Sequence, residues 1–290
     1  MNYSIDIIIV TYNSSKVIFN CINSIKNNLN FLPSIFVIDN LSTDKTVKII
    51  KSNFSFVNLI INESNIGFGA AINKAIPLCE SEYIFFLNPD TEIYQKTIPN
   101  IINYMKSNPS IGLAGTRVIR PDGSVQSTIS YHYPGQRHAK QEKYIFNSLK
   151  GKIAWVNGSS MVARTHAIKS ISGFDEDFFL YAEEIDLCFR LKKSGWQIGY
   201  IENSPVLHLK GHSEVNTDLY NYWLKKLNGR FTFYKKHYSK ATLQKLIFLY
   251  RMQAYFRLFI LLLTFKTKST KSKIARYKAV LKVITFSSKY

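Results

Sequence analysis

The chain has 290 residues, 46% of them hydrophobic, which is enough for one large domain or for one domain plus an extension. Its net charge of +19 is unevenly placed, because residues 219–290 hold 17 Lys and Arg and no Asp or Glu. Residues 1–218 are therefore nearly neutral, and we predict a boundary near residue 219. A charge confined to one end argues against a nucleic-acid-binding groove, which interleaves basic and aromatic residues within the fold.

The three cysteines, Cys21, Cys79 and Cys188, are far apart and show no metal-ligand spacing. We expect reduced thiols in the core of a cytosolic protein. The N-terminus lacks a basic region followed by a long apolar run, so no signal peptide is expected.

Short apolar runs alternate with segments of helical periodicity in the first part of the chain. We predict strands at residues 5–10, 35–38, 57–61 and 83–87. Strand and helix alternate four times, which is typical of a mainly parallel α/β sheet with helices on both faces.

Polar residues follow the first, second and fourth of these strands. They are Thr11-Tyr12-Asn13, Asp39-Asn40 and Asn88-Pro89-Asp90. The carboxyl ends of parallel strands meet at one edge of the sheet, where open α/β sheets bind ligands. Three polar clusters at one edge therefore predict a pocket for a polar ligand.

Asp90 has two interpretations. A carboxylate at this edge can hold Mg²⁺ or Mn²⁺, which keeps coordination positions open for substrate phosphates. Alternatively, Asp90 caps the helix that begins near Tyr94. His208, which follows Pro205, is either a structural histidine or a further ligand of the same metal.

Gly67 and Gly69 precede a predicted helix. They do not form a dinucleotide fingerprint, because the third glycine position holds Ile72 and the pair follows the third strand. Two interpretations remain: a tight turn, or backbone N–H groups that approach a phosphate or a sugar.

The second half of the body is less regular. Residues 113–119 predict a strand, residues 153–161 a strand pair broken at Asn157-Gly158, and residues 196–200 a short strand. Residues 125–150 lack a clear period and are either a solvated loop or a functional segment, namely a mobile segment over the site or an acceptor surface.

An acidic cluster opens a helix predicted from residue 183 to residue 193. Glu183 and Asp186 share one face of this helix, and Glu184 points elsewhere. Clustered carboxylates repel each other, which raises the pKa of at least one and favours a proton acceptor near neutral pH. The alternative is acidic residues that the helix macrodipole favours at an N-terminus.

Taken together, these motifs resemble a known family. They are Thr11-Tyr12-Asn13, VIDNLSTDKT (37–46), NIGFGAAIN (65–73), FLNPDT (86–91), PDGS (121–124), WVNGSSMVAR (155–164), GFDEDFFLYAEEIDLCFRLKKSGW (173–196) and the later His208. In this order they resemble glycosyltransferase family 2, and within it the bacterial rhamnosyltransferase-like branch. The resemblance implies a GT-A fold and an inverting, metal-dependent transfer of a sugar from a nucleotide diphosphate to an acceptor hydroxyl.

The resemblance also implies roles for individual residues. The nucleotide would contact Thr11, Tyr12, Asn13, Asp39, Asn40, Asn65, Gly67 and Asn88. The metal, Mg²⁺ or Mn²⁺, would be held by Asp90, the second acid of the family's DxD motif, and by His208. The sugars would lie along Trp155, Asn157 and Gly158. The base position of the family holds Glu184 instead of Asp, with Asp186 and Glu183 as the other candidates.

The branch suggests L-rhamnose from dTDP-rhamnose as the donor and a glycan or lipid-linked acceptor in surface polysaccharide synthesis. A UDP-hexose donor and a catalytically inactive scaffolding subunit of a polysaccharide synthase are the alternatives.

The basic region 219–290 lies outside the resemblance. Residues 246–265 are strongly apolar but include Arg251 and Arg257, which are costly at a bilayer centre, so no transmembrane span is expected. We expect a basic, amphipathic helical extension lying on an anionic membrane surface at the cytoplasmic face. The alternative is a helical pair packed on the body.

Overall fold

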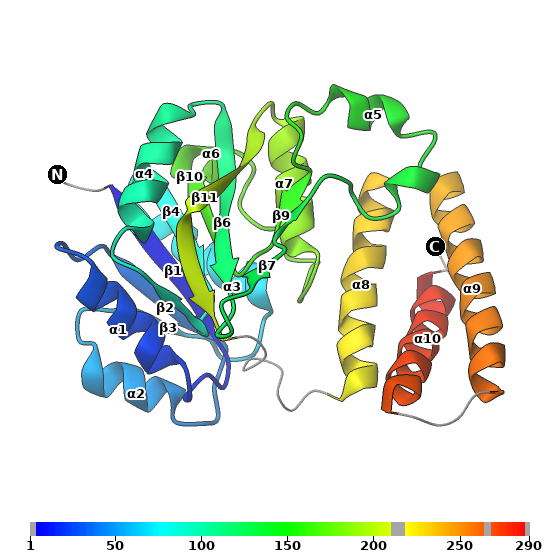
Figure 1. Cartoon of the computed structure of the whole chain (residues 1–290), viewed down its shortest axis with the longest axis horizontal. Helices are drawn as coiled ribbons and strands as arrows, with labels where there is room; N and C mark the ends of the chain where they lie inside the picture. The colour runs from blue at the N-terminus through cyan, green and yellow to red at the C-terminus, as the bar shows by residue number, and fades with distance from the viewer. Residues whose placement is uncertain (1–3, 210–217, 264–267, 288–290) are drawn as a thin grey trace. The chain divides into compact units, whose positions relative to one another are not determined.

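The structure, a computed structural model, describes residues 4–209, 218–263 and 268–287. These residues form two compact units (Figure 1). The first unit contains residues 4–132, 149–179 and 183–209, and the second contains residues 133–148, 180–182 and the described part of the basic region. The domain boundary predicted near residue 219 stays a prediction.

One mixed sheet forms the centre of the first unit. Its strands are β1 (Ile5–Thr11), β2 (Ile35–Asp39), β3 (Asn58–Ile61), β4 (Tyr83–Leu87), β5 (Thr91–Ile93), β6 (Ile111–Ile119), β7 (Val125–Gln126), β10 (Ser160–Arg164) and β11 (Gln197–His208). The order is β3-β2-β1-β4-β10-β6-β11-β5, with β7 paired to β6. The first four strands in this order are parallel, as predicted, and β10 is antiparallel to both of its neighbours.

Helices cover both faces of this sheet. They are α1 (Ile18–Asn28), α2 (Thr46–Asn53), α3 (Phe68–Ala75) with the 3₁₀ turn η1 (Ile76–Leu78), α4 (Thr97–Ser107), α6 (Thr165–Ser170) and α7 (Glu183–Lys193). Alternate side chains of β1 enter two cores: Ile7 and Ile9 pack with α1, α2 and α4, whereas Ile8 and Val10 pack with α3, α6 and α7. This two-sided burial explains the continuous apolar runs of the parallel strands.

The strand predicted at residues 196–200 continues much further. It runs as β11 to His208, with an irregularity in its pairing to β6 between Ile201 and Pro205. A bulge lets the strand accommodate the proline, which lacks a backbone donor. The longer strand places His208 opposite Thr91 of β5, which is the residue that directly follows Asp90.

The predicted break at Asn157-Gly158 separates strands of two sheets. Before it, β9 (Trp155–Val156) pairs with β8 (Ile129–Ser130) in a small separate sheet. After it, β10 enters the central sheet between β4 and β6.

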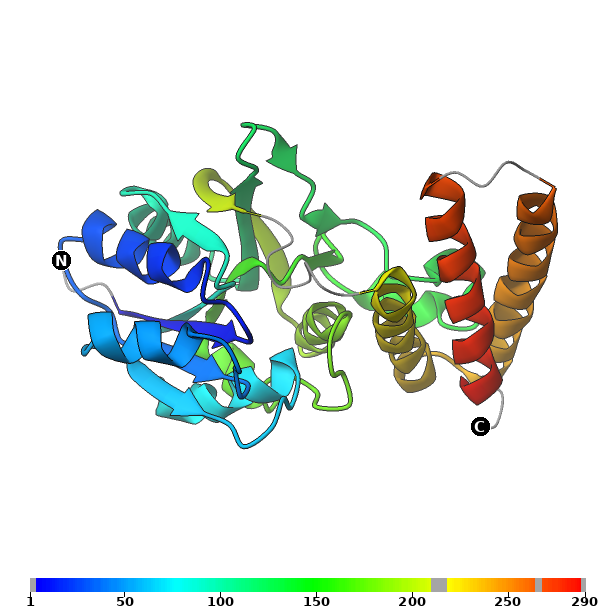
Figure 2. The same cartoon turned by 90° about the horizontal axis from the view of Figure 1, so that it is seen from below.

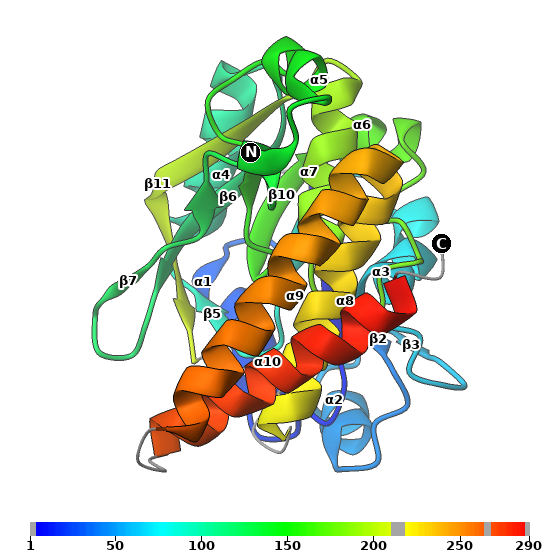
Figure 3. The same ribbon diagram turned by 90° about the vertical axis from the view of Figure 1, so that its right-hand side faces the viewer.

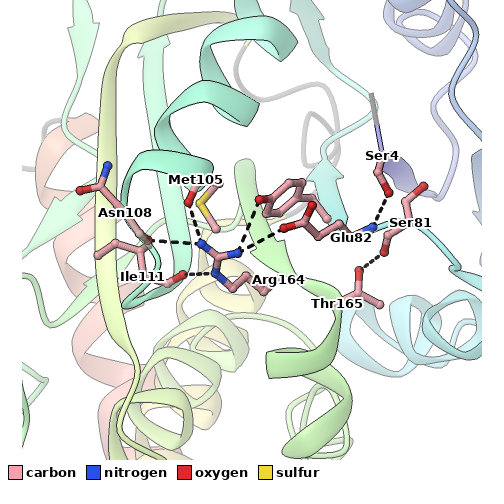
Figure 4. Close-up of polar contacts among 9 residues, drawn as sticks. Ser4, Ser81, Glu82, Met105, Asn108, Ile111, Arg164 and Thr165 are labelled. Carbon is pink, nitrogen blue, oxygen red and sulfur yellow. Dashed lines mark hydrogen bonds and ion pairs between the residues drawn. The ribbon is translucent and has the colours of Figure 1, made fainter. Parts of the chain in front are cut away.

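Arg164, at the end of β10, ties the sheet to α4 (Figure 4). Its buried guanidinium donates hydrogen bonds to three backbone carbonyls, those of Met105 (2.6 Å), Ile111 (3.0 Å) and Asn108 (3.3 Å). Two of these acceptors lie at the C-terminus of α4, where carbonyls lack helical partners. Arg164 pairs in register with Tyr83, the first residue of β4. This group of hydrogen bonds therefore lies at the edge of the sheet opposite the polar clusters.

Cys21, Cys79 and Cys188 are buried and form no disulfide, as predicted. Burial is the largest cause of the rise in the pKa of each thiol to about 12. They are structural core residues, because the reactive form of cysteine is the thiolate.

The second unit is helical. It contains η2 (Gln136–His138), α5 (Lys143–Ser148), α8 (Leu219–His237), α9 (Lys240–Leu262) and α10 (Lys268–Ser287). Figures 2 and 3 show α10 alongside both α8 and α9. Of the helices described, none combines the length and the apolarity needed to cross a membrane.

Residues 133–148 are not a solvated loop, in contrast to one interpretation of the sequence, because they pack within the helical unit. The Tyr133 ring stacks on Phe233 of α8 with centroids 5.9 Å apart. The Glu142 carboxylate accepts hydrogen bonds from the Ser239 N–H and the Thr242 hydroxyl at the start of α9. These contacts join distant parts of the chain, so the local sequence pattern does not reveal them.

Candidate active site

The ends of β1 and β2 are joined by buried hydrogen bonds. The Thr11 hydroxyl donates to Asp39 Oδ1 over 2.8 Å, and the Ser42 hydroxyl donates to the same oxygen over 2.6 Å. The Ser42 N–H donates to the other carboxylate oxygen over 2.7 Å. Asp39 is therefore held rigidly at the sheet edge and shapes the loop that follows β2.

Asn13 extends the same network in a left-handed backbone conformation, with φ of 53°. Its N–H donates to the Ser42 hydroxyl and its side-chain oxygen accepts from the Thr43 N–H, each over 2.8 Å. The neighbouring Tyr12 leaves 45% of its surface exposed. The first two predicted clusters thus form one preorganised edge with an accessible aromatic ring.

The glycine-containing loop before α3 is a tight turn. Gly67 has φ of 90°, and a Cβ at this position would overlap the carbonyl of Phe179. The N–H of Gly67 is bound by the Asn65 side chain and the N–H of Phe68 by the Phe179 carbonyl. Both donors are used within the chain, which favours the turn interpretation over a phosphate-binding one. Asn40 supports the turn by donating to the Gly67 carbonyl over 3.0 Å.

Asp90 and His208 meet in the same part of the sheet. His208 Nε2 lies 3.3 Å from Asp90 Oδ1, and both side chains are largely buried. His208 Nδ1 lies 3.2 Å from Gln126 Oε1, so a proton on Nδ1 would be donated to this oxygen and would leave Nε2 available to ligate a cation. The capping interpretation of Asp90 is wrong, because α4 begins at Thr97 without a side-chain cap.

This pair fits a divalent cation. Asp90 Oδ1 is buried without a hydrogen-bond partner in the described structure, which is costly unless a cation or proton lies against it. A carboxylate oxygen and an imidazole nitrogen both ligate Mn²⁺, and the Gln126 contact is the outer-shell bond typical of a ligating histidine. Among the described residues no group of three His, Cys, Asp or Glu converges, so other ligands would come from substrate and water.

Three carboxylates at the start of α7 lie in different environments, and all are buried. Asp186 accepts a 2.6 Å charged hydrogen bond from Arg190. Burial and then the charge of Glu184 raise the pKa of Glu183 well above its usual range. The predicted helix bounds, residues 183–193, are confirmed.

Gly158 connects the acidic helix to the Asp90 loop. A Cβ built on Gly158 would lie 3.8 Å from the Glu184 Cβ, in ordinary van der Waals contact. The next residue, Ser159, accepts a 3.0 Å hydrogen bond at its carbonyl from the Asn88 N–H. Asn88 and Glu184 therefore flank one short loop, although they are far apart in sequence.

Trp155 and Asn157 precede this loop. The Trp155 indole N–H donates to the His132 carbonyl over 3.1 Å, and the Asn157 side chain accepts from the Ser159 N–H over 3.1 Å. These bonds shape the β9–β10 connection, while contact of either residue with a sugar stays a prediction.

Sequence reasoning missed two residues that organise the site. Gln126 positions His208 but lies in a segment without periodicity, so no sequence signal marks it. Ser42 lies within the motif at residues 37–46, but no local pattern marks it as the donor of two hydrogen bonds to Asp39.

The first unit has a GT-A fold, as solved structures confirm. A mannosyltransferase from Pyrobaculum calidifontis, in complex with GDP-Man and Mn²⁺, aligns with a TM-score of 0.62 at 12% identity, covering 99% of this chain and 87% of that one. Residues 1–349 of S. aureus TarS, in complex with UDP-GlcNAc, align with a TM-score of 0.52 at 19% identity, covering 77% and 64%. This chain spans only 38% of the longer TarS structure.

Residues 6–172 match the model of glycosyl transferase family 2, so the chain belongs to that family. It is 28% identical over 210 residues to the N-acetylglucosaminyl-diphospho-decaprenol L-rhamnosyltransferase of Mycobacterium tuberculosis, covering 62% of this chain and 67% of the relative. It is 25% identical over 169 residues to rhamnosyltransferase WbbL of Escherichia coli K12, covering 50% and 62%. The resemblance to the rhamnosyltransferase-like branch is thereby confirmed.

Proposed function

We propose that the protein is an inverting glycosyltransferase that moves L-rhamnose from dTDP-rhamnose to a hydroxyl of a glycan or lipid-linked acceptor in surface polysaccharide synthesis. The observation that carries this proposal is the loop at Gly158 and Ser159. A Cβ built on Gly158 would lie 3.8 Å from the Glu184 Cβ, and the Ser159 carbonyl accepts a hydrogen bond from the N–H of Asn88, two residues before Asp90. This proximity supports a single site that combines a proton acceptor with a diphosphate-binding edge.

Glu184 is our candidate for the catalytic base. Its carboxylate removes the acceptor proton while the acceptor oxygen attacks C1 of the sugar and the bond from C1 to the diphosphate breaks. Attack from the face opposite the diphosphate inverts the configuration at C1. Burial and the charge of Glu184 raise the pKa of Glu183, which makes Glu183 the poorer proton acceptor, and we therefore assign the role of base to Glu184, near Gly158. Asp186 is less suited to this role because it is paired with Arg190.

Asp90 and His208 would hold Mg²⁺ or Mn²⁺ in the proposed enzyme. When bound, such an ion neutralises the charge of the departing diphosphate. The Mn²⁺ in the Pyrobaculum mannosyltransferase complex supports divalent metal use in this fold.

The nucleotide would lie along the rigid edge formed by the β1 and β2 loops. Its proposed contacts are Thr11, Tyr12, Asn13, Asp39, Asn40, Asn65 and Asn88, and Gly67, whose N–H is bound by Asn65, would act by shaping the loop beside the nucleotide. Preorganisation supports this role, because side chains already held by internal hydrogen bonds lose little freedom when a ligand binds. The sugars would lie along Trp155, Asn157 and Gly158.

We further propose that the protein acts in the cytoplasm, at the inner face of the cell membrane. The name of the mycobacterial relative includes a decaprenol-linked acceptor, and such acceptors reside in membranes. The basic region supports this location through attraction to anionic lipids.

Two alternatives have specific support. The neighbouring structures hold UDP-GlcNAc and GDP-Man, so this fold accommodates other nucleotides and a UDP-hexose donor is possible. Glu184 replaces the family's aspartate, which keeps an inactive scaffolding subunit as the second alternative.

The test is thermal stabilisation of wild type, Glu184→Gln and Glu202→Gln by dTDP, UDP and GDP, with and without Mn²⁺ or Mg²⁺, followed by turnover. Ligands that bind the native state raise the melting temperature. We expect a metal-dependent shift with dTDP in all three proteins, and loss of turnover only in Glu184→Gln. A shift with UDP alone would identify a hexose donor. The absence of a shift with any nucleotide would contradict the proposal that the protein is an active glycosyltransferase.

A further inference from the structure

Helix α9 carries a stripe of large apolar side chains that remain exposed. These residues, together with Leu263 directly after the helix, are between 53% and 75% exposed. We call them the α9 stripe: Phe248, Met252, Tyr255, Phe256, Phe259 and Leu263. Apart from the adjacent pair Tyr255 and Phe256, they recur at intervals of three or four residues, which places them on one face of the helix.

The opposite face of α9 is also apolar. Leu243, Leu246, Ile247 and Ala254 are buried within the helical unit, where α9 packs beside α8 and α10. The expectation of an amphipathic helix is therefore wrong in one respect, because packing already buries one apolar face and a second apolar face is left exposed. A contiguous exposed apolar surface of this kind marks an interaction site rather than ordinary surface variation.

The positive charge of the helical unit selects the partner of the stripe. Exposed cations are present on α9 itself, at Lys245 and Arg257, and on α10, at Lys271, Lys273 and Lys278. Residues 219–290 contain no Asp or Glu that could offset them. A second copy of this chain would bring the same positive charge against the surface, whereas an anionic bilayer offers both a negative interface and an apolar interior.

We propose that the α9 stripe inserts into the interface of an anionic bilayer, with α9 lying parallel to the membrane plane. The aromatic and aliphatic side chains enter the boundary between headgroups and acyl chains, and the lysines and arginines contact lipid phosphates. The role of this surface, presentation of the site to a lipid-linked acceptor, rests on the proposed function. The existence of the surface does not rest on the proposed function, because vesicle binding and nucleotide binding are separate measurements.

The test is sedimentation of the full chain with vesicles of phosphatidylcholine alone or with about 30% phosphatidylglycerol. The test variant is Phe256→Ser with Phe259→Ser, and the matched control is Gln253→Ser, an exposed polar position on the same helix. We expect wild type and control to sediment with the anionic vesicles. The double variant should bind about tenfold more weakly for each phenylalanine removed, with an unchanged melting temperature because both rings are exposed.

Equal sedimentation of wild type and the double variant would overturn the proposal, as would failure of wild type to bind either vesicle. A wild-type dimer that the double variant loses, without vesicle binding, would also overturn it and identify a second copy as the partner. A missing thermal shift with nucleotides would instead count against the proposed function and leave the vesicle result standing.

Discussion

His208 Nε2 lies 3.3 Å from Asp90 Oδ1, although Asp90 follows β4 and His208 ends β11. The antiparallel pairing of β11 with β5 places His208 opposite Thr91 and so brings the imidazole to the carboxylate. β11 continues past the irregularity between Ile201 and Pro205 to reach this position. A residue that sequence spacing leaves isolated thus becomes half of a candidate metal pair.

We expect Asp90→Asn to lose the metal-dependent part of nucleotide binding, because the amide keeps the shape but not the charge of a metal ligand. The measurement is the Mn²⁺-dependent thermal shift with dTDP or UDP, and affinity should fall at least about 100-fold. Glu202→Gln, an exposed change on β11, is the matched control and should behave as wild type. A full Mn²⁺-dependent shift in Asp90→Asn would remove Asp90 from the metal site.

Gln126→Leu should lower the affinity of metal-dependent nucleotide binding by about tenfold, because His208 would lose its hydrogen-bond partner at Nδ1. Binding of the nucleotide without metal should be unchanged. If Mn²⁺ titration gives the wild-type affinity in this variant, Gln126 does not position the histidine.

Glu183→Gln should become increasingly stable relative to wild type as the pH rises. The pKa of Glu183 is higher in the folded chain than in the unfolded chain, so the folded protein holds this proton more tightly. Above the unfolded pKa of about 4.3, ionisation favours the unfolded chain, and wild type loses stability until the folded pKa is passed. Glutamine cannot ionise, so the variant avoids this loss.

The measurement for Glu183→Gln is the melting temperature from about pH 5 to about pH 9. Glu63→Gln, at an exposed position, is the control and should follow wild type. A difference between Glu183→Gln and wild type that is independent of pH would show that the Glu183 carboxyl group does not titrate as described.

Asp186→Asn should lower stability, whereas Glu184→Gln should lower turnover. Removal of the Asp186 charge leaves the partly buried Arg190 without its 2.6 Å partner, which costs about 3 kcal/mol. Chemical denaturation measures the first effect and turnover at saturating donor measures the second. Normal turnover in Glu184→Gln together with inactive but stable Asp186→Asn would assign the base to Asp186.

Gly229→Ala should destabilise the protein even though alanine favours helices by about 1 kcal/mol over glycine. A Cβ at Gly229 of α8 would overlap the backbone carbonyl of Tyr181, and we expect a net loss of about 2 kcal/mol. Tyr181 and Ala182 both have φ of 71° and directly precede Glu183, so turnover should fall as well. Asn228→Ala, at an exposed position of the same helix, should not lower stability.

The sequence by itself determined the local elements and the polar sheet edge. The four parallel strands, helix α7 and the break at Asn157-Gly158 follow from apolar runs, periodicity and turn residues, which act over a few neighbouring positions. The clusters after β1, β2 and β4 follow from the rule that parallel strands end at one edge.

Only the tertiary structure decided which strands and helices pair. The insertion of β10 between β4 and β6, the run of β11 to His208 and the packing of residues 133–148 in the helical unit all join distant segments. Periodicity shows that a face is apolar but not what will cover it, as the α9 stripe demonstrates. Pairing depends on the competition among all long-range contacts against the entropy of closing the chain between them, which no local pattern records.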